Sequence, residues 1–296
     1  AAALAGKKTT FLKVKPKINQ DIKTICVGNI YLGGTGKTPT SIKLYEIIKK
    51  FNPNVLTAKK FYPSQVDENI ILQKNTKLIS AKSRKIIIEQ AIKDQQDIVI
   101  FDDGLQDRSV SYDIEFVCFD SINFIGNGQL IPAGPLREKL NSLNKYDGIF
   151  LKGDNKISND QLTLIKKNNP DIKIFETYFE ITNLDKFNLT DNFLIFSGIG
   201  NPASFSENLV QSKFNIKKEI IFPDHYNYKK REIKNIIKLA KDINAKIITT
   251  EKDFVKISKF GFNNINRVEY QGVNLDKIQS LDDIKKVKGS MDIQSF

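Results

Sequence analysis

Short apolar runs alternate with amphipathic stretches over the first 175 residues of the chain. Runs rich in β-branched and aromatic residues predict strands at 24–27, 54–57, 77–80, 97–101, 114–119, 148–151 and 172–175. Amphipathic stretches between them predict helices at 40–51, 83–93 and 160–168. Strands that alternate with helices in this way favour an α/β fold, with a mostly parallel sheet and helices on both faces.

The pattern pauses in a polar, turn-rich segment at residues 180–192 and then begins again. The second part predicts strands at 193–196, 219–222 and 246–249, with helices at 202–211 and 228–242. We therefore expect a domain boundary near residue 185, with a nucleotide-binding domain at 1–185 and a smaller C-terminal α/β domain at 186–296. Residues 282–296 look like a polar tail.

The first predicted strand leads into a glycine-rich loop, Gly33-Gly34-Thr35-Gly36, followed by Lys37, Thr38 and a helix start. Such a loop turns its backbone N–H groups inward around phosphates, while the lysine reaches the β- and γ-phosphates and the hydroxyl ligates Mg²⁺. The following helix directs its positive dipole end to the same place. The motif predicts a P-loop NTPase-like fold that binds a nucleoside triphosphate, although Tyr31 stands where the strict motif has glycine.

Two adjacent carboxylates, Asp102 and Asp103, directly follow the apolar strand predicted at 97–101. Adjacent carboxylates repel each other in a partly dry site unless a cation neutralises them. Ligands of open α/β sheets bind beyond the carboxyl ends of the strands, so this pair is expected beside the glycine-rich loop. We interpret it as a Walker B-like magnesium site.

Other candidate residues lie in loops. Residues 127–138 form a long irregular segment that ends in Arg137, which could clamp a phosphate, and Glu138, which could complete a metal shell. His225 is the only histidine of the chain and follows an aspartate at a predicted strand end. Asp67 and Glu68 offer another carboxylate pair, which taken alone reads as part of a solvated loop.

Asn144-Lys145-Tyr146-Asp147 matches the N-K-x-D motif that reads guanine. In GTPases this motif follows a strand, whereas here it precedes the strand at 148–151. Its side chains are therefore expected at the opposite sheet edge, and the match does not indicate guanine binding.

The length, composition and net charge of the chain exclude only some classes of function. The chain has 296 residues, 40% of them apolar, and 46 Lys and Arg against 34 Asp and Glu give a net charge of +12. This charge favours anionic partners, namely nucleic acid, anionic lipid or phosphorylated substrates, but part of it can equally reflect a lysine-rich composition. No apolar run approaches the ~20 residues of a membrane span. The two cysteines, Cys26 and Cys118, lie in apolar strands and are expected to be reduced core thiols.

A series of motifs in order over residues 24–258 resembles the tetraacyldisaccharide 4′-kinase family, the lipid A 4′-kinases. The motifs are Val-Gly-Asn-x3-Gly-Gly-Thr-Gly-Lys-Thr-Pro at 27–39, Asp-Asp-Gly-Leu-Gln at 102–106, Pro-Ala-Gly-Pro-Leu-Arg-Glu at 132–138, Gly-Ile-Gly-Asn-Pro at 198–202, Phe-Pro-Asp-His at 222–225 and Thr-Thr-Glu-Lys-Asp at 249–253. Such a set is far more specific than the P-loop alone.

The resemblance implies a kinase that transfers the γ-phosphate of ATP to the 4′-hydroxyl of a tetraacyldisaccharide 1-phosphate, giving lipid IV-A. It implies Mg²⁺ as cofactor and a peripheral place on the cytoplasmic face of the inner membrane, with no nucleic acid and no obligate protein partner. The resemblance assigns triphosphate binding to the P-loop and Arg137, and metal binding to Thr38, Asp102, Asp103 and Glu138. Asp67 would be the base, paired with His225.

The chain departs from the family pattern on the substrate side. The family's Ser-Arg-Gly-Tyr-Gly corresponds to a segment within residues 57–62, Val66 replaces the glycine of Gly-Asp-Glu, and Asp107 replaces a histidine. We expect the family's apolar N-terminal helix to be reduced to residues 1–12 or lost, so that membrane docking would rest on lysines and on the acyl chains of the substrate.

Two other classes remain open at this stage. A deviant-Walker ATPase that acts as a switch shares Gly-Gly-Thr-Gly-Lys-Thr, but its signature lysine is replaced here by Leu32. A nucleic-acid-dependent ATPase rests on the positive charge alone, without a base-stacking or groove-reading motif.

Overall fold

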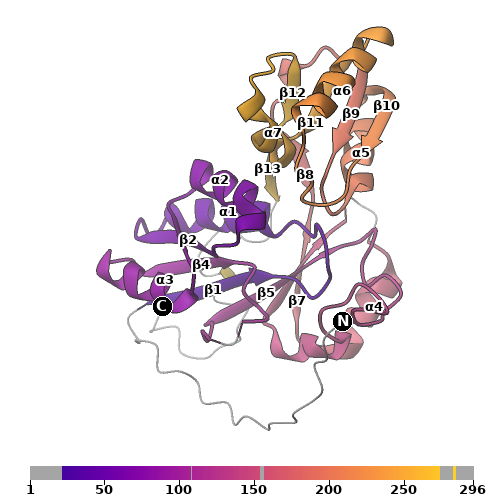
Figure 1. Cartoon of the computed structure of the whole chain (residues 1–296). Helices are drawn as coiled ribbons and strands as arrows, with labels where there is room; N and C mark the ends of the chain where they lie inside the picture. Colours follow the sequence, from indigo (N-terminus) through magenta and orange to yellow (C-terminus); the bar gives the residue numbers. More distant parts are fainter. Residues whose placement is uncertain (1–21, 108, 154–156, 274–282, 285–296) are drawn as a thin grey trace.

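Two parallel sheets, joined by a short antiparallel pair of strands, form the molecule (Figure 1). The computed structural model describes residues 22–107, 109–153, 157–273 and 283–284. Among the helices of these ranges, none has the length and apolar character that a membrane span requires.

The first sheet has seven strands in the order β3-β2-β4-β1-β5-β6-β7, and all neighbouring pairs are parallel. Its strands are β1 (Lys23–Gly28), β2 (Val55–Lys60), β3 (Leu78–Ala81), β4 (Ile98–Asp102), β5 (Ile114–Asp120), β6 (Gly148–Lys152) and β7 (Lys173–Thr177). Its α-helices are α1 (Lys37–Lys49), α2 (Val66–Asn75), α3 (Arg84–Lys93) and α4 (Asn159–Asn168). Short 3₁₀ turns are η1 (Pro63–Gln65) and η2 (Leu140–Lys145).

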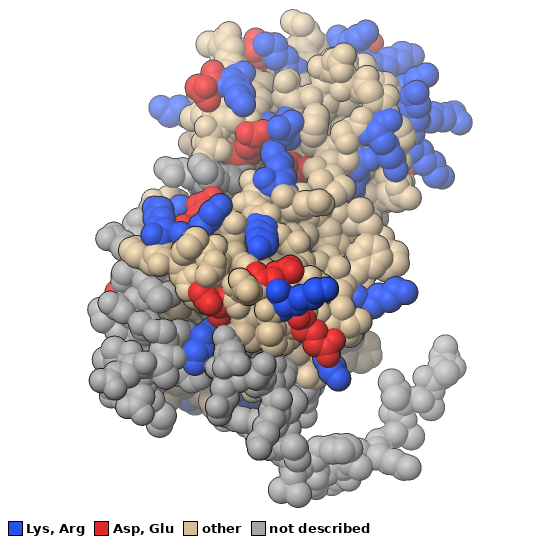
Figure 2. Space-filling model, turned by 90° about the vertical axis from the view of Figure 1, so that its left-hand side faces the viewer, with Lys and Arg blue, Asp and Glu red and all other residues tan. Residues whose placement is uncertain are grey.

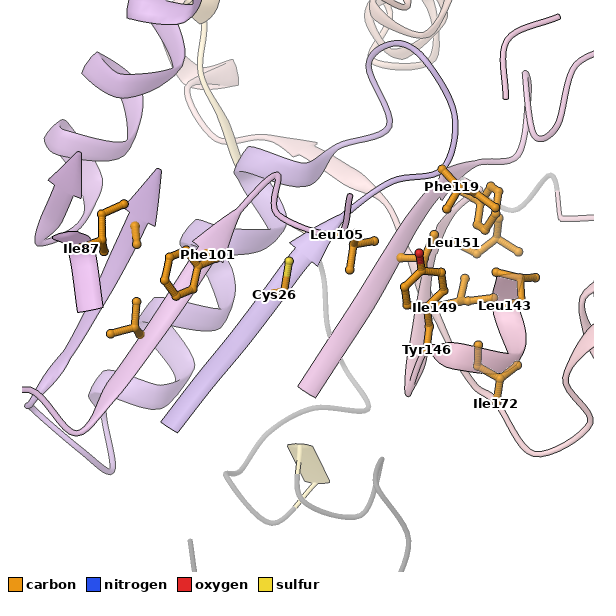
Figure 3. Close-up of a cluster of buried hydrophobic side chains, with 14 of the residues drawn as sticks. Cys26, Ile87, Phe101, Leu105, Phe119, Leu143, Tyr146, Ile149, Leu151 and Ile172 are labelled. Atoms are coloured by element: carbon orange, nitrogen blue, oxygen red, sulfur yellow. The ribbon is translucent and has the colours of Figure 1, made fainter. Parts of the chain in front are cut away.

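Both faces of this sheet are buried, because helices pack on each of them. Strand residues alternate between the two faces. Ile25 and Val27 of β1 pack on the face covered by α1, and Cys26 packs on the other face with α3 and α4. Figure 3 shows the cluster on the face covered by α3 and α4, with Cys26 of β1, Phe101 of β4 and Ile87 of α3. The predicted parallel sheet with helices on both faces is thus confirmed, and both cysteines are buried and free, as expected.

The second sheet has four parallel strands in the order β10-β9-β11-β12. Its elements are β9 (Asn192–Ser197), α5 (Pro202–Gln211), β10 (Asn215–Ile221), α6 (Lys230–Asp242), β11 (Lys246–Thr250), α7 (Glu251–Ile257), η4 (Ser258–Phe260) and β12 (Ile265–Val268). Side chains of α6 and α7 cover one face and those of α5 cover the other. The predicted smaller α/β unit is therefore present.

A two-stranded antiparallel ribbon of β8 (Phe179–Ile181) and β13 (Tyr270–Val273) joins the two sheets (Figure 1). The short turn η3 (Leu184–Lys186) follows β8. The predicted division at residue 185 falls just after β8, between the two strands of the ribbon in sequence, and stays a prediction.

Several elements differ from the sequence-based prediction. The helices α2 and α7 and the strands β8, β12 and β13 were not predicted, and β10 begins at Asn215 instead of residue 219. Of the polar tail expected at 282–296, only 283–284 lie within the described residues. Ile284 is buried in the cluster with α1, so at this position the tail prediction is wrong.

Candidate active site

The glycine-rich loop connects β1 to α1 and requires glycine at specific positions. Gly33 has a φ of 129° and Gly36 a φ of 86°, values that side chains disfavour. A Cβ on Gly28 would lie 2.6 Å from Leu105 Cγ, so the chain passes close to the segment after β4. The Asn29 amide is buried and donates to the carbonyl of Gly33 (3.2 Å), which fixes the loop from inside.

Asp102 lies at the end of β4, next to this loop, because β4 is a neighbour of β1. Its carboxylate accepts hydrogen bonds from Thr38 Oγ1 (3.0 Å) and Ser41 Oγ (3.1 Å) at the start of α1. Lys59 Nζ of β2 also lies 2.9 Å from it. The carboxylate that the sequence marks as Walker B-like therefore lies within hydrogen-bond distance of the P-loop hydroxyl of Thr38.

Asp103 and Arg137 form the other side of this edge. Asp103 lies 3.9 Å from Lys37 Nζ and 3.0 Å from Arg137 Nη1, and Arg137 also donates to Asn29 Oδ1 (2.8 Å). Burial raises the pKa of Asp103, but the Lys37 and Arg137 cations outweigh it and lower that pKa overall. Arg137 is thus anchored beside the P-loop, close to the carboxylate that also pairs with Lys37.

Glu138 lies close to this group but has different partners. Its carboxylate accepts hydrogen bonds from the Tyr146 hydroxyl (2.9 Å) and the Gln106 amide (2.9 Å). In the ranges that the structure describes, no three His, Cys, Asp or Glu side chains gather as a group able to hold a metal ion. The predicted magnesium ligands Thr38 and Asp102 are in contact, whereas the place of Glu138 in a metal shell stays a prediction.

Asp67 lies in the first turn of α2, a helix that the sequence analysis took for a loop. Its carboxylate is buried, and Oδ2 lies 3.7 Å from His225 Nδ1, 3.4 Å from Lys256 Nζ and 4.0 Å from Lys252 Nζ. Burial raises the pKa of Asp67, but His225 and the two lysines outweigh it and lower that pKa. Asp67 is therefore held as a carboxylate.

His225 comes to Asp67 from the other sheet, in the turn between β10 and α6. Its backbone has a φ of 56°, an uncommon value for a residue with a side chain. Among the residues that the structure describes, neither His225 Nδ1 nor Asp67 Oδ2 has a hydrogen-bond partner, although both atoms are buried. The two atoms are 3.7 Å apart, so one hydroxyl group beside them could contact both.

Lys59 was not recognised as a site residue from the sequence. Its side chain is 1% exposed, and Nζ lies 2.8 Å from Glu68 and 2.9 Å from Asp102. Burial lowers the pKa of Lys59, but the two carboxylates outweigh it and raise that pKa. Lys59 thus links the nucleotide edge of β4 to the helix that carries Asp67.

The loop after β9, in the second sheet, packs against the P-loop. The Asp253 carboxylate accepts hydrogen bonds from Gly198 N (2.9 Å) and Thr250 Oγ1 (2.8 Å), which joins the start of α7 to the loop after β9. In that loop a Cβ on Gly200 would lie 2.4 Å from Gly34 N, so only glycine permits this approach. The motif at 198–202 therefore contacts the P-loop, and the motif at 249–253 fixes the loop that makes this contact.

A cleft of about 640 Å³ lies between the two sheets. Its walls include residues from the segments that carry both sheets: Gly33, Gly34, Thr35, Gly36, Lys37, Thr38, Glu68, Asp103, Arg137, Lys152, Gly200, Asn201, Ser204, Asp224, His225 and Lys252. The guanine-reading match at 144–147 lies elsewhere: Asp147 accepts a hydrogen bond from Glu115 N at the opposite ends of the strands, as expected. The cleft offers the phosphate-binding loop with Lys37 and Arg137 and, from the other sheet, His225, whose ring lies 3.7 Å from the Asp67 carboxylate.

Comparisons with known proteins agree with this geometry. The model of the family described as "Tetraacyldisaccharide-1-P 4′-kinase" matches residues 2–286. A tetraacyldisaccharide 4′-kinase of Pelagibacter ubique is 46% identical over 268 residues, covering 90% of this chain and 84% of the relative. A tetraacyldisaccharide 4′-kinase of Rickettsia felis is 37% identical over 261 residues, covering 82% of this chain and 77% of the relative.

A solved structure titled as the "apo" form of LpxK from Aquifex aeolicus in complex with ATP is also similar. It has a TM-score of 0.62 and 20% sequence identity, and the match covers 90% of this chain and 88% of that one. This likeness confirms the predicted P-loop NTPase-like fold. The family match does not support the switch-ATPase alternative. The chain belongs to the tetraacyldisaccharide-1-P 4′-kinase family.

Proposed function

We propose that this protein transfers the γ-phosphate of ATP to the 4′-hydroxyl of a tetraacyldisaccharide 1-phosphate, giving lipid IV-A. Family membership supports this reaction, and one observation carries it for these residues. Asp67 of α2 lies 3.7 Å from His225, which comes from the other sheet and lines the same cleft as the P-loop. A switch ATPase needs no such pair, whereas a kinase needs a group that receives the acceptor proton.

The P-loop and Arg137 would bind the triphosphate. The backbone N–H groups of residues 33–38 lie at the N-terminus of α1, where the helix dipole favours negative charge. Lys37 lies beside Asp103, and Arg137 is anchored by Asn29 and Asp103, so both cations are positioned before a nucleotide arrives. Their charge would stabilise the phosphates as the bond to the leaving oxygen breaks.

The residues at the start of α1 fit Mg²⁺. The Thr38 hydroxyl and the Asp102 carboxylate are oxygen donors in contact at 3.0 Å, the kind of ligand that this ion prefers. Thr38, Asp102 and Asp103 would hold the ion directly or through its waters. When bound, Mg²⁺ neutralises charge on the β- and γ-phosphates.

Asp67 would receive the proton of the attacking 4′-hydroxyl. The bond between this oxygen and the γ-phosphorus forms while the bond from phosphorus to the β,γ-bridging oxygen breaks, and ADP leaves. The low pKa of Asp67 makes it a weak base for a sugar hydroxyl. The transition state of phosphoryl transfer is loose, so positioning and charge neutralisation dominate, and His225 can orient the carboxylate and carry the proton onward.

The acceptor also determines where the protein would work. A tetraacylated lipid resides in a membrane, and we infer that the protein acts peripherally at the cytoplasmic face of the inner membrane. Its net charge of +12 favours an anionic lipid surface.

The test is the transfer of labelled γ-phosphate from ATP to tetraacyldisaccharide 1-phosphate in detergent micelles. Label in the lipid with the wild-type chain, and a loss of at least ~10²-fold with His225→Ala, would support the proposal. Label released only as free phosphate would refute it and favour a switch ATPase.

A further inference from the structure

Apolar side chains are exposed where β2 leads into α2. Phe61, Tyr62, Val66 and Ile70 are 43, 40, 44 and 42% exposed. Val66 and Ile70 are four residues apart and so lie on one face of α2, and the two aromatic residues come directly before this helix. Exposed apolar residues gathered in this way mark an interaction surface more often than those scattered singly.

The start of α3 extends this surface. Phe61 N donates to Ala81 O (2.8 Å), because β2 and β3 are paired, so the segment after β3 lies beside Phe61. That segment carries Ile86, which is half exposed, and the exposed cations Lys82 and Lys85. We call the apolar residues Phe61, Tyr62, Val66, Ile70 and Ile86, with Lys60, Lys82 and Lys85, the α2–α3 patch.

The three lysines of the α2–α3 patch outnumber the two carboxylates, Asp107 and Glu89, that pair with them. Lys60 Nζ lies over the Tyr62 ring, 5.5 Å from its centroid, and is 3.9 Å from Asp107. Lys85 is 3.8 Å from Glu89. Glu68 points inward to Lys59 and so does not offset the lysines at the surface. Figure 2 shows the side of the molecule where α2 and α3 lie in Figure 1, and on it lysine and arginine lie among uncharged residues and several aspartate and glutamate side chains.

The same helix serves the cleft and the patch. Asp67, directly after Val66, is buried and faces His225, whereas Val66 and Ile70 face outward. An acceptor sugar at Asp67 would therefore have its acyl chains within reach of the outward face of α2. Aromatic and aliphatic side chains bordered by lysines suit the boundary between acyl chains and anionic headgroups.

We propose that the α2–α3 patch is the surface that docks onto a bilayer containing anionic lipid, with Phe61 and Tyr62 inserted at headgroup depth. This inference rests on the proposed function, because it takes the acceptor to be a membrane lipid. Docking by this patch brings the first turn of α2, with Asp67, to the membrane surface. Lys60, Lys82 and Lys85 attract the negative headgroups.

A tryptophan introduced at the patch tests this directly, because the chain contains no tryptophan. Phe61→Trp is compared with Phe51→Trp, whose side chain is 54% exposed just after the C-terminal end of α1. Each variant is titrated with vesicles of zwitterionic lipid alone and with added anionic lipid. We expect a blue shift and quenching by brominated acyl chains for Phe61→Trp with anionic vesicles, and neither effect for Phe51→Trp.

Vesicle binding by a variant without tryptophan tests the same docking surface. Ile70→Ser combined with Ile86→Ser, two exposed patch residues outside the substrate-side segment at 57–62, should weaken anionic-vesicle binding on the order of tenfold, with phosphate transfer in detergent micelles retained. Unchanged emission of Phe61→Trp in a chain that still phosphorylates lipid in micelles would overturn the docking surface and leave the proposed function standing. Equal shifts in both tryptophan variants, or a shift that appears without lipid as protein concentration rises, would also overturn it. Absence of transfer in micelles by the wild-type chain would instead refute the proposed function.

Discussion

Replacing Lys59 by methionine tests the ion pairs that link the P-loop edge to α2. Methionine keeps a stem of similar length and removes only the charge. Lys59 is 1% exposed, and its Nζ is 2.8 Å from Glu68 and 2.9 Å from Asp102. Removing one partner of a buried pair leaves an uncompensated charge and typically costs about 3–5 kcal/mol.

The lower end of that range applies here, because both carboxylates keep other partners. Asp102 retains the hydroxyls of Thr38 and Ser41, and Glu68 retains Lys252 at 2.8 Å. A cost of about 3 kcal/mol, at roughly 2–4 °C per kcal/mol, lowers Tm by about 6–12 °C. Circular dichroism during heating measures this change.

Lys60→Met is the matched control, since Lys60 is the next residue and its ion pair with Asp107 is long (3.9 Å) and partly exposed. Such a surface pair contributes at most about 1 kcal/mol, so Tm should change little. Burial raises the pKa of Glu68, but Lys59 and Lys252 outweigh it and lower that pKa below the ordinary 4.5. The stability from this pair is therefore present above pH 4.5 and is lost as pH falls below it, so the gap between wild type and Lys59→Met should narrow in acid. A Lys59→Met variant that melts like Lys60→Met at neutral pH would refute this reasoning.

Other variants address the site itself. Lys37→Ala should abolish turnover, because it removes the cation at the β- and γ-phosphates, and a transfer assay that still shows turnover would contradict this role. Asp67→Asn should lower kcat by about 10²–10⁴-fold with little change in ATP affinity, since only the proton acceptor is lost; an unchanged kcat would remove Asp67 as base. Lys256→Met should raise the pKa of Asp67, because it removes the cation 3.4 Å from the carboxylate. The acid limb of the plot of kcat/KM against pH should then move to higher pH. An unmoved limb would show that Lys256 does not control the pKa of the base. Chelation of Mg²⁺ should stop transfer and readdition should restore it, and activity that persists in excess chelator would exclude a metal at Thr38.

Local patterns were sufficient to predict the first sheet and its P-loop. The glycine-rich segment, Lys37 and the carboxylates at the end of β4 are each readable from a few neighbouring residues, and parallel strands bring them to one edge. The family motifs then pointed to Asp67 and His225, which the fold brings together.

The helix α2 was missed because its signals are weak. Pro63 precedes it, no side chain caps it, and the consecutive apolar residues 70–72 do not follow a helical period. Its acidic first turn was the available signal, since Asp67 and Glu68 suit a helix N-terminus. The strands β12 and β13 are short, four residues each, and carry little pattern.

The role of Lys59 depends on tertiary structure that no local pattern contains. A lysine at the end of an apolar strand is tolerated only because the strand order places Asp102 of β4 on one side of it and Glu68 of α2 on another. The approach of Gly200 to Gly34 likewise depends on how the second domain docks. Such contacts become visible only when the sheets are assembled.

The most direct test of the central claim is the identity of the product formed by the wild-type chain. Tetraacyldisaccharide 1-phosphate is incubated with ATP and Mg²⁺, and the lipid is analysed by tandem mass spectrometry and phosphorus NMR. The account predicts a bisphosphorylated lipid with the new phosphate on the 4′-oxygen of the distal glucosamine. A phosphate at another position, or an unchanged lipid with only inorganic phosphate released, would contradict it.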